Sequence, residues 1–78
     1  MSTFSYPVVI YADPDAPGAY IAEAPDLPGM ATEGPTVEAA LANAREAIAA
    51  YLEELRARGL EPPLSSAVVL GSVSVQVA

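Results

Sequence analysis

Carboxylates are the only side chains in this sequence that could carry out acid–base or metal chemistry. The chain contains no histidine, cysteine or lysine, so the common general bases, thiol nucleophiles and Schiff-base amines are missing. Five carboxylates fall in the first part of the chain, at Asp13, Asp15, Glu23, Asp26 and Glu33. Such oxygens, gathered on a small sheet, could hold Mg²⁺ or Ca²⁺.

These five positions also have an explanation that needs no ligand. Asp13, Asp15 and Asp26 stand next to prolines, where aspartate commonly bonds turn backbone, and Glu23 and Glu33 can be solvated strand residues. Asp13-Pro14-Asp15 does not follow EF-hand spacing, and the glycines are isolated rather than grouped in a phosphate loop. We therefore expect no catalytic residue, no bound metal and no cofactor.

Length and charge limit the classes of function. Seventy-eight residues form one domain, residues 1–78. The net charge is −7, with three arginines as the only basic side chains. This charge argues against direct nucleic-acid binding and favours either a solvated surface or a basic protein partner. We find no signal peptide and no apolar run of bilayer length, so we expect a cytoplasmic protein with no membrane contact.

The apolar content is high for so small a domain. The chain is 53% apolar, yet it has no cysteine for disulfides and no usual zinc ligands to stabilise a small core. Part of this apolar surface is therefore expected to be buried between subunits. The simplest arrangement is a two-fold homodimer.

Local signals predict four strands and one long helix. Residues 4–12, 19–24 and 30–33 are expected to be strands, and the alternating valines of 72–77 predict a fourth. Residues 64–70 are ambiguous between a strand and an apolar connection. Leu27-Pro28-Gly29-Met30 has the residues of a type II turn, with glycine where φ must be positive.

The helix follows this turn and the third strand. Thr36 is the expected N-cap, and Gly59 the expected residue just beyond the C-terminus. One apolar stripe recurs at helical spacing and is interpreted as core. Its members are Val37, Leu41, Ala44, Ile48, Leu52 and Leu55.

The element order β-β-β-α-β predicts an α+β fold. We expect a mixed four-stranded sheet of order 3-2-1-4, with the helix on one face and the last strand beside the first. The other face would then be uncovered within the monomer and would carry Val9, Tyr11 and Ile21. Together with Val73 and Val75 of the last strand, these residues form the expected oligomer interface.

At this point the sequence resembles a known family. The run 18–29, Gly-Ala-Tyr-Ile-Ala-Glu-Ala-Pro-Asp-Leu-Pro-Gly, precedes a Thr36-capped, alanine-rich helix. This pattern, over residues 5–63, is similar to the N-terminal domain of HicB-type antitoxins. The resemblance implies a partial ribonuclease-H-like fold that lacks the nuclease's carboxylate set and is not catalytic.

The resemblance also implies partners. HicB-type antitoxins bind and block HicA, a small basic ribonuclease that cleaves messenger RNA, and they form dimers or tetramers. An acidic blocker suits a basic toxin. The expected partner contacts are in the acidic β half, at Tyr11, Asp13, Asp15, Glu23, Asp26 and Glu33. Many members carry a further DNA-binding domain, which has no counterpart here, so the resemblance is to a short form.

Two other hypotheses stay open from the residues alone. The chain could be a stand-alone homo-oligomer that binds a small ligand or metal through an acidic groove. It could also be a nuclease, which would need two or more carboxylates converging on a metal ion.

Overall fold

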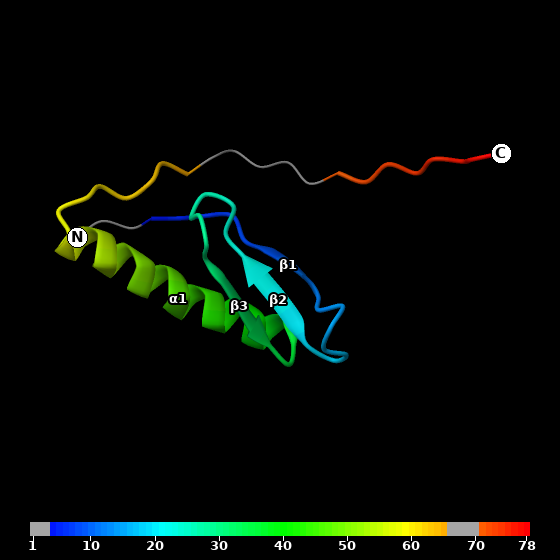
Figure 1. The fold of residues 1–78 in the computed structure, drawn as a ribbon, viewed down its shortest axis with the longest axis horizontal. Helices are drawn as coiled ribbons and strands as arrows, with labels where there is room; N and C mark the ends of the chain where they lie inside the picture. Colours follow the sequence, from blue (N-terminus) through cyan, green and yellow to red (C-terminus); the bar gives the residue numbers. More distant parts are fainter. Residues whose placement is uncertain (1–3, 66–70) are drawn as a thin grey trace.

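The computed structural model describes residues 4–65 and 71–78 of the chain, which form three strands and one helix. The strands are β1 (Val9–Ala12), β2 (Tyr20–Glu23) and β3 (Ala31–Gly34), and the helix is α1 (Val37–Ala57) (Figure 1). The predicted α+β class and the three N-terminal strands are confirmed. Residues 66–70, whose structure the sequence left ambiguous, lie outside the described residues.

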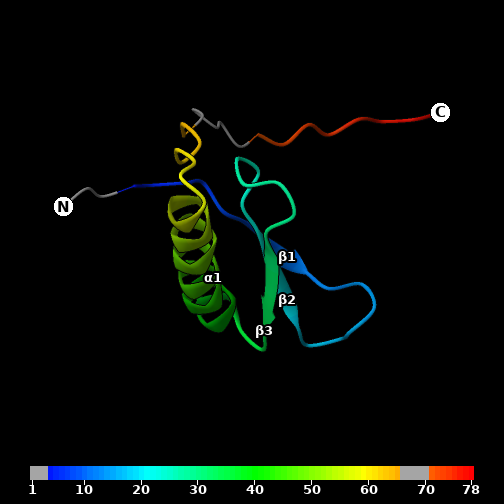
Figure 2. The same cartoon turned by 60° about the vertical axis from the view of Figure 1, so that its left-hand side comes forward.

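The sheet is an antiparallel meander of order β1-β2-β3. In its register, Ile10 stands opposite Ala22, which stands opposite Thr32. The helix packs on one face of this sheet, as predicted (Figure 2). The β1 strand begins only at Val9 because Pro7, just before it, cannot donate a backbone hydrogen bond to a ladder.

The predicted fourth strand is not part of this sheet. Residues 71–78 form no strand, and Val73, Val75 and Val77 are exposed. The mixed, four-stranded sheet of order 3-2-1-4 is therefore not what the described residues form. Alternating valines favour extended backbone, but the alternation does not say which strand, in which chain, supplies the hydrogen bonds of a ladder.

The β2–β3 connection is the rigid corner that the sequence predicts. The Met30 amide donates to the Leu27 carbonyl at 3.0 Å, and Gly29 has φ of +81°. This is the type II turn, confirmed. It places Leu27 at the centre of the core, where it is fully buried.

The two ends of α1 are capped as expected. The Thr36 hydroxyl accepts a hydrogen bond from the Ala39 amide at 3.0 Å. At the other end Gly59, with φ of +72°, donates to the Arg56 carbonyl, and Leu60 donates to the Leu55 carbonyl. This pair of bonds is a Schellman motif.

The buried face of α1 agrees with the predicted apolar stripe only in part, because Ala44 is buried and Ile48, Leu52 and Leu55 are half-buried, but Val37 and Leu41 are exposed. The helix residues that are fully buried are Ala40 and Ala44, while Val37 and Leu41 are nearly half exposed. Only small residues fit at the buried positions of α1, because the helix lies very close to β3. A Cβ atom on Gly34 would lie 2.5 Å from the Ala40 nitrogen. The core is correspondingly small, with Leu27 and Met30 as its largest buried side chains.

Candidate functional site

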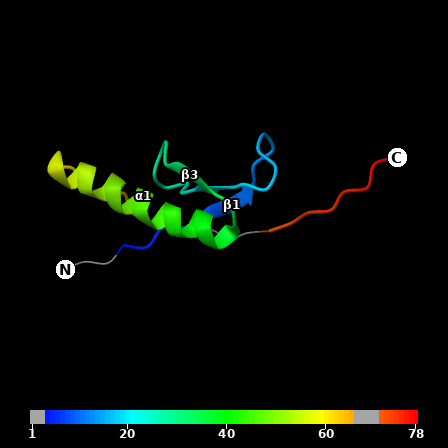
Figure 3. The ribbon, with the colours of Figure 1, turned by 90° about the horizontal axis from the view of Figure 1, so that it is seen from below.

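The face of the sheet opposite α1, here called the open face, carries most of the predicted partner-binding residues. Because Ala22 is buried with Ala40 and Ala44, its neighbours along β2 must point the other way. Among the described elements, only α1 packs on the sheet, and it lies on one side (Figure 3). Strand register places six residues on the open face: Val9, Tyr11, Ile21, Glu23, Ala31 and Glu33. Asp13, just after β1, joins them through its hydrogen bond with Glu33.

Tyr11 and Glu23 are linked across β1 and β2. The Tyr11 hydroxyl donates to Glu23 Oε1 at 2.7 Å. The two residues are diagonal neighbours on one face, since Tyr11 stands opposite Ile21. Accepting this bond, the Glu23 carboxylate raises the pKa of Tyr11 above its ordinary value, with a smaller contribution from burial. The phenol is therefore held as a neutral donor whose ring stays partly exposed.

Asp13 and Glu33 form a second linked pair on the open face. Their carboxyl groups are hydrogen-bonded to each other. The pKa of Asp13 is lowered, chiefly because its carboxylate accepts a 2.9 Å bond from the Asp15 amide, and also because of the bond with Glu33. The pKa of Glu33 is raised by the hydrogen bond and the negative charge of Asp13. The pair thus favours one shared proton.

The remaining two predicted contacts lie off this face. Asp15 is exposed in the β1–β2 loop, next to the open face. Asp26 is half-buried in the β2–β3 connection, and the pKa of Tyr6, which precedes β1, is raised chiefly by burial and further by the negative charge of Asp26. Because Val9 stands opposite Glu23, Asp26 lies at the end of the sheet away from the Asp13 loop. The structure therefore brings together Tyr11, Asp13, Glu23 and Glu33, with Asp15 beside them, and separates Asp26 from them.

Charge is distributed unevenly between the two layers. The strand half, up to Gly34, contains five carboxylates and no basic side chain, whereas all three arginines lie on or just after α1. Within the described ranges, 4–65 and 71–78, no group of three or more carboxylates is placed to hold a metal ion. What the open face can do chemically is accept hydrogen bonds and pair with cations supplied by another molecule.

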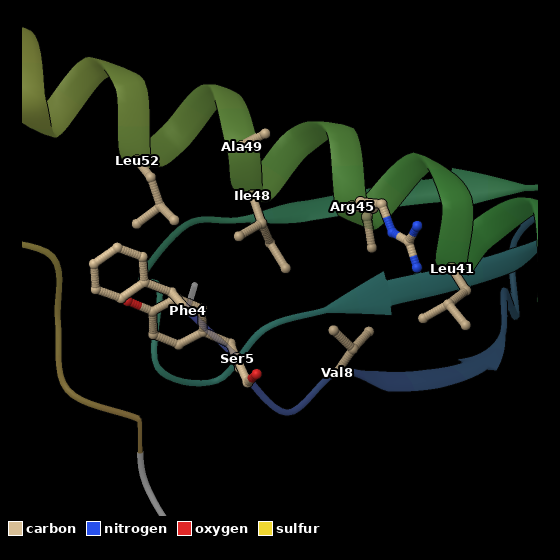
Figure 4. A pocket seen from close by; sticks show the side chains of 10 residues that line it. Phe4, Ser5, Val8, Leu41, Arg45, Ile48, Ala49 and Leu52 are labelled. Carbon is tan, nitrogen blue, oxygen red and sulfur yellow. The ribbon is translucent and has the colours of Figure 1, made fainter. Parts of the chain in front are cut away.

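Sequence reasoning missed a groove on the other side of the sheet. It lies between α1 and the chain that leads into β1, with a volume of about 540 Å³ (Figure 4). Helical spacing of Leu41, Ile48 and Leu52 was a usable signal for one wall, but it was interpreted as core. We call this the edge groove, and its lining is Phe4, Ser5, Tyr6, Val8, Leu41, Ala44, Arg45, Ile48, Ala49 and Leu52.

Comparison with known proteins agrees with the resemblance seen in the sequence. The sequence model of the HicB-like antitoxin of bacterial toxin–antitoxin systems matches residues 6–74. This chain belongs to the HicB-like antitoxin family. The match covers β1, the proline-rich corner and α1, and it continues past the helix into the C-terminal segment.

A relative with a related sequence extends the comparison. The HicB-like chain is 42% identical over 62 residues to the UPF0150 protein Ta0767 of Thermoplasma acidophilum. The aligned part covers 80% of this chain and 87% of that relative. In the part of the chain that the structure describes, no helix is both long and apolar enough to cross a bilayer.

Proposed function

We propose that this HicB-like chain is the antitoxin of a toxin–antitoxin pair and that it neutralises a basic, HicA-type ribonuclease by covering it with the open face. The observation that carries the proposal is the arrangement of Tyr11, Asp13, Glu23 and Glu33 on one unoccupied face, with no basic side chain in the strand half. Opposite charge accelerates the encounter and excludes acidic competitors.

The chemistry of the face supports binding rather than catalysis. The carboxyl groups of Asp13 and Glu33 are hydrogen-bonded to each other, and Glu23 accepts a hydrogen bond from Tyr11. Neither pair has a histidine, lysine or metal site to work with. A partner's arginine or lysine side chains can reach these exposed oxygens, and the Tyr11 ring adds apolar contact at the centre. The proposed role is therefore non-catalytic.

The alternative of an acidic ligand-binding groove receives less support. The acids of the strand half lie mainly on the open face of the sheet, whereas the edge groove is lined mostly by apolar side chains, with Ser5, Tyr6 and Arg45, and contains no carboxylate. We therefore place the partner contact on the open face.

The test is a binding and inhibition assay with any small basic protein whose gene adjoins the gene of this chain. The triple variant Asp13→Asn/Glu23→Gln/Glu33→Gln removes charge from the open face. The matched control, Glu38→Gln/Glu46→Gln/Glu53→Gln, removes as many charges from α1. We expect the open-face variant to bind at least about tenfold more weakly, from three lost charge pairs, and to relieve inhibition of RNA cleavage. Equal losses in both variants, or no binding by the unmodified chain, would contradict the proposal.

A further inference from the structure

The edge groove is built from the largest apolar side chains of α1. Leu41, Ile48 and Leu52 form one wall, and Phe4 and Val8 face them from the chain before and into β1 (Figure 4). Leu41 is 48% exposed and Phe4 50% exposed, while the neighbouring buried positions of the helix are alanines. The side chains best suited to a core therefore line a surface that the described chain leaves open.

The backbone beside this groove also has an edge without a neighbouring strand among the described residues. β1 pairs on one side with β2 and has no strand on its other side among the described residues. The opposite edge is covered in part, because α1 lies close to β3 and Asn43 of α1 donates to the Glu33 carbonyl at 2.8 Å. A bare edge strand is a template for pairing with another strand. Strand addition to this sheet is thus directed to β1.

The C-terminal residues 72–77, here called the valine segment, have the pattern such a strand needs. Val73, Val75 and Val77 alternate with Ser72, Ser74 and Gln76 and are 87%, 77% and 85% exposed. In an extended chain, the four steps from Val73 to Val77 cover about 13 Å. The helix wall from Leu41 to Leu52 covers about 16 Å. Three valines on one face therefore match the length of the groove.

We propose that the valine segment of one chain adds to the free edge of β1 in a second copy, so that its valines fill the edge groove there. In the described structure the segment does not occupy the groove of its own chain, and its end lies away from sheet and helix in every view (Figures 1, 2 and 3). If each copy gives its valine segment to the other, the result is a closed two-fold dimer.

The distribution of charge favours exchange of the valine segments over direct contact between the folded, acidic parts of the two copies. The whole net charge of −7 lies on residues before 62, and residues 62–78 carry no charged side chain. Two acidic bodies repel each other, whereas a neutral strand can cross between them without that cost. The exchange uses the helix-side groove and leaves the open face of both copies accessible, and it does not depend on the proposed toxin.

The test uses cysteines, which the natural chain lacks. Val8→Cys is mixed with Val73→Cys, Val75→Cys or Val77→Cys in turn and oxidised. We expect one of these mixtures to give a heterodimer in high yield. Ser74→Cys, on the other face of the segment, is the matched control and should not cross-link. The doubly substituted chain should form covalent dimers. An internal disulfide within one chain, which would mean that the segment folds back on its own β1, overturns the proposal, and so does the absence of any bridge.

A second measurement does not rely on disulfide geometry. Sedimentation of the natural chain should give a concentration-dependent dimer. Val75→Glu should raise its dissociation constant by at least about tenfold, because a charge enters an apolar groove, while Ser74→Glu should change it little. Both variants alter an exposed segment, so circular dichroism should show an intact fold. A monomer at all concentrations, or equal dimers from both variants, overturns the proposal.

Discussion

The two edges of this small sheet differ in how they are covered by the rest of the chain. At the β3 edge the helix approaches closely enough that only glycine fits at Gly34, and Asn43 satisfies the Glu33 carbonyl. At the β1 edge Leu41 and Phe4 remain half exposed around the edge groove, and no described strand adds to β1. The β3 edge is thus packed against α1 through small residues. The β1 edge leaves an apolar surface exposed, where we propose that a strand of a second copy binds.

The contrast between the two edges shows which residues stabilise a single chain. It comes from the proline-rich corner and the alanine face of α1, around Leu27, rather than from the larger side chains of the helix. Net stability of small domains is only a few kcal/mol. Substitutions at the two edges should therefore have very different effects on the free energy of unfolding.

The largest effect is expected at the closed side of the molecule. Leu27→Ala removes the largest fully buried side chain and leaves a cavity, so we expect a loss of about 2–5 kcal/mol in the free energy of unfolding. Denaturant titration measures this loss. Leu64→Ala is the matched control, because Leu64 is 92% exposed. Similar losses in the two variants would show that the corner is not the centre of the core.

A somewhat smaller effect is expected at the contact between β3 and α1. Gly34→Ala would place a Cβ atom 2.5 Å from the Ala40 nitrogen, which belongs to helix backbone and cannot rotate away. Overpacking of this kind costs about 1–3 kcal/mol. Gly71→Ala is the control, since a Cβ there meets nothing within 4 Å. A neutral Gly34→Ala in thermal unfolding would mean that the helix can shift away from β3.

Sequence patterns predicted the corner and the helix well, because their causes are local. The Leu27–Met30 turn follows from proline and glycine positions, and the helix ends follow from Thr36 and Gly59. The open face was also predictable, since strand alternation places Tyr11 with Ile21. The Asp13–Glu33 pair was not, because it depends on strand register and on loop geometry across β2.

The helix face and the fourth strand were harder for a related reason. Periodicity located an apolar stripe, but the close approach at Gly34 rotated the alanines inward and left Leu41 outside. In an alanine-rich helix, the face that is buried depends on the closest backbone contact as well as on the largest side chains. Likewise, the alternation at Val73 and Val75 predicts extended chain without identifying its partner strand.

The open edge should respond differently from the closed one. Leu41→Ala removes a side chain that is already 48% exposed, so we expect a loss of at most about 1 kcal/mol in dilute protein. The same variant should weaken self-association if the valine segment fills the edge groove. Unfolding experiments at low and high protein concentration measure the two effects separately. A loss as large as that of Leu27→Ala in dilute protein would show that the groove is already part of the core.

The smallest expected effect is the pH response of the Asp13–Glu33 pair. The raised pKa of Glu33 means that the folded chain prefers its protonated form, so this contribution to stability is lost as pH rises through that pKa. The lowered pKa of Asp13 acts in the opposite sense, and its contribution is lost as pH falls through the lower value. The pair is most favourable between the two, with one proton shared.

Glu33→Gln separates these contributions, because an amide can donate to the Asp13 carboxylate at any pH. Relative to the natural chain, the variant should gain stability as pH rises through the raised pKa of Glu33, and the difference should shrink in acid. Glu46→Gln removes the same charge from the exposed surface of α1 and is the control. Thermal unfolding between mildly acidic and neutral pH measures both variants. Parallel pH curves for the two would show that general repulsion among the acids, rather than the shared proton beside the open face, governs the response.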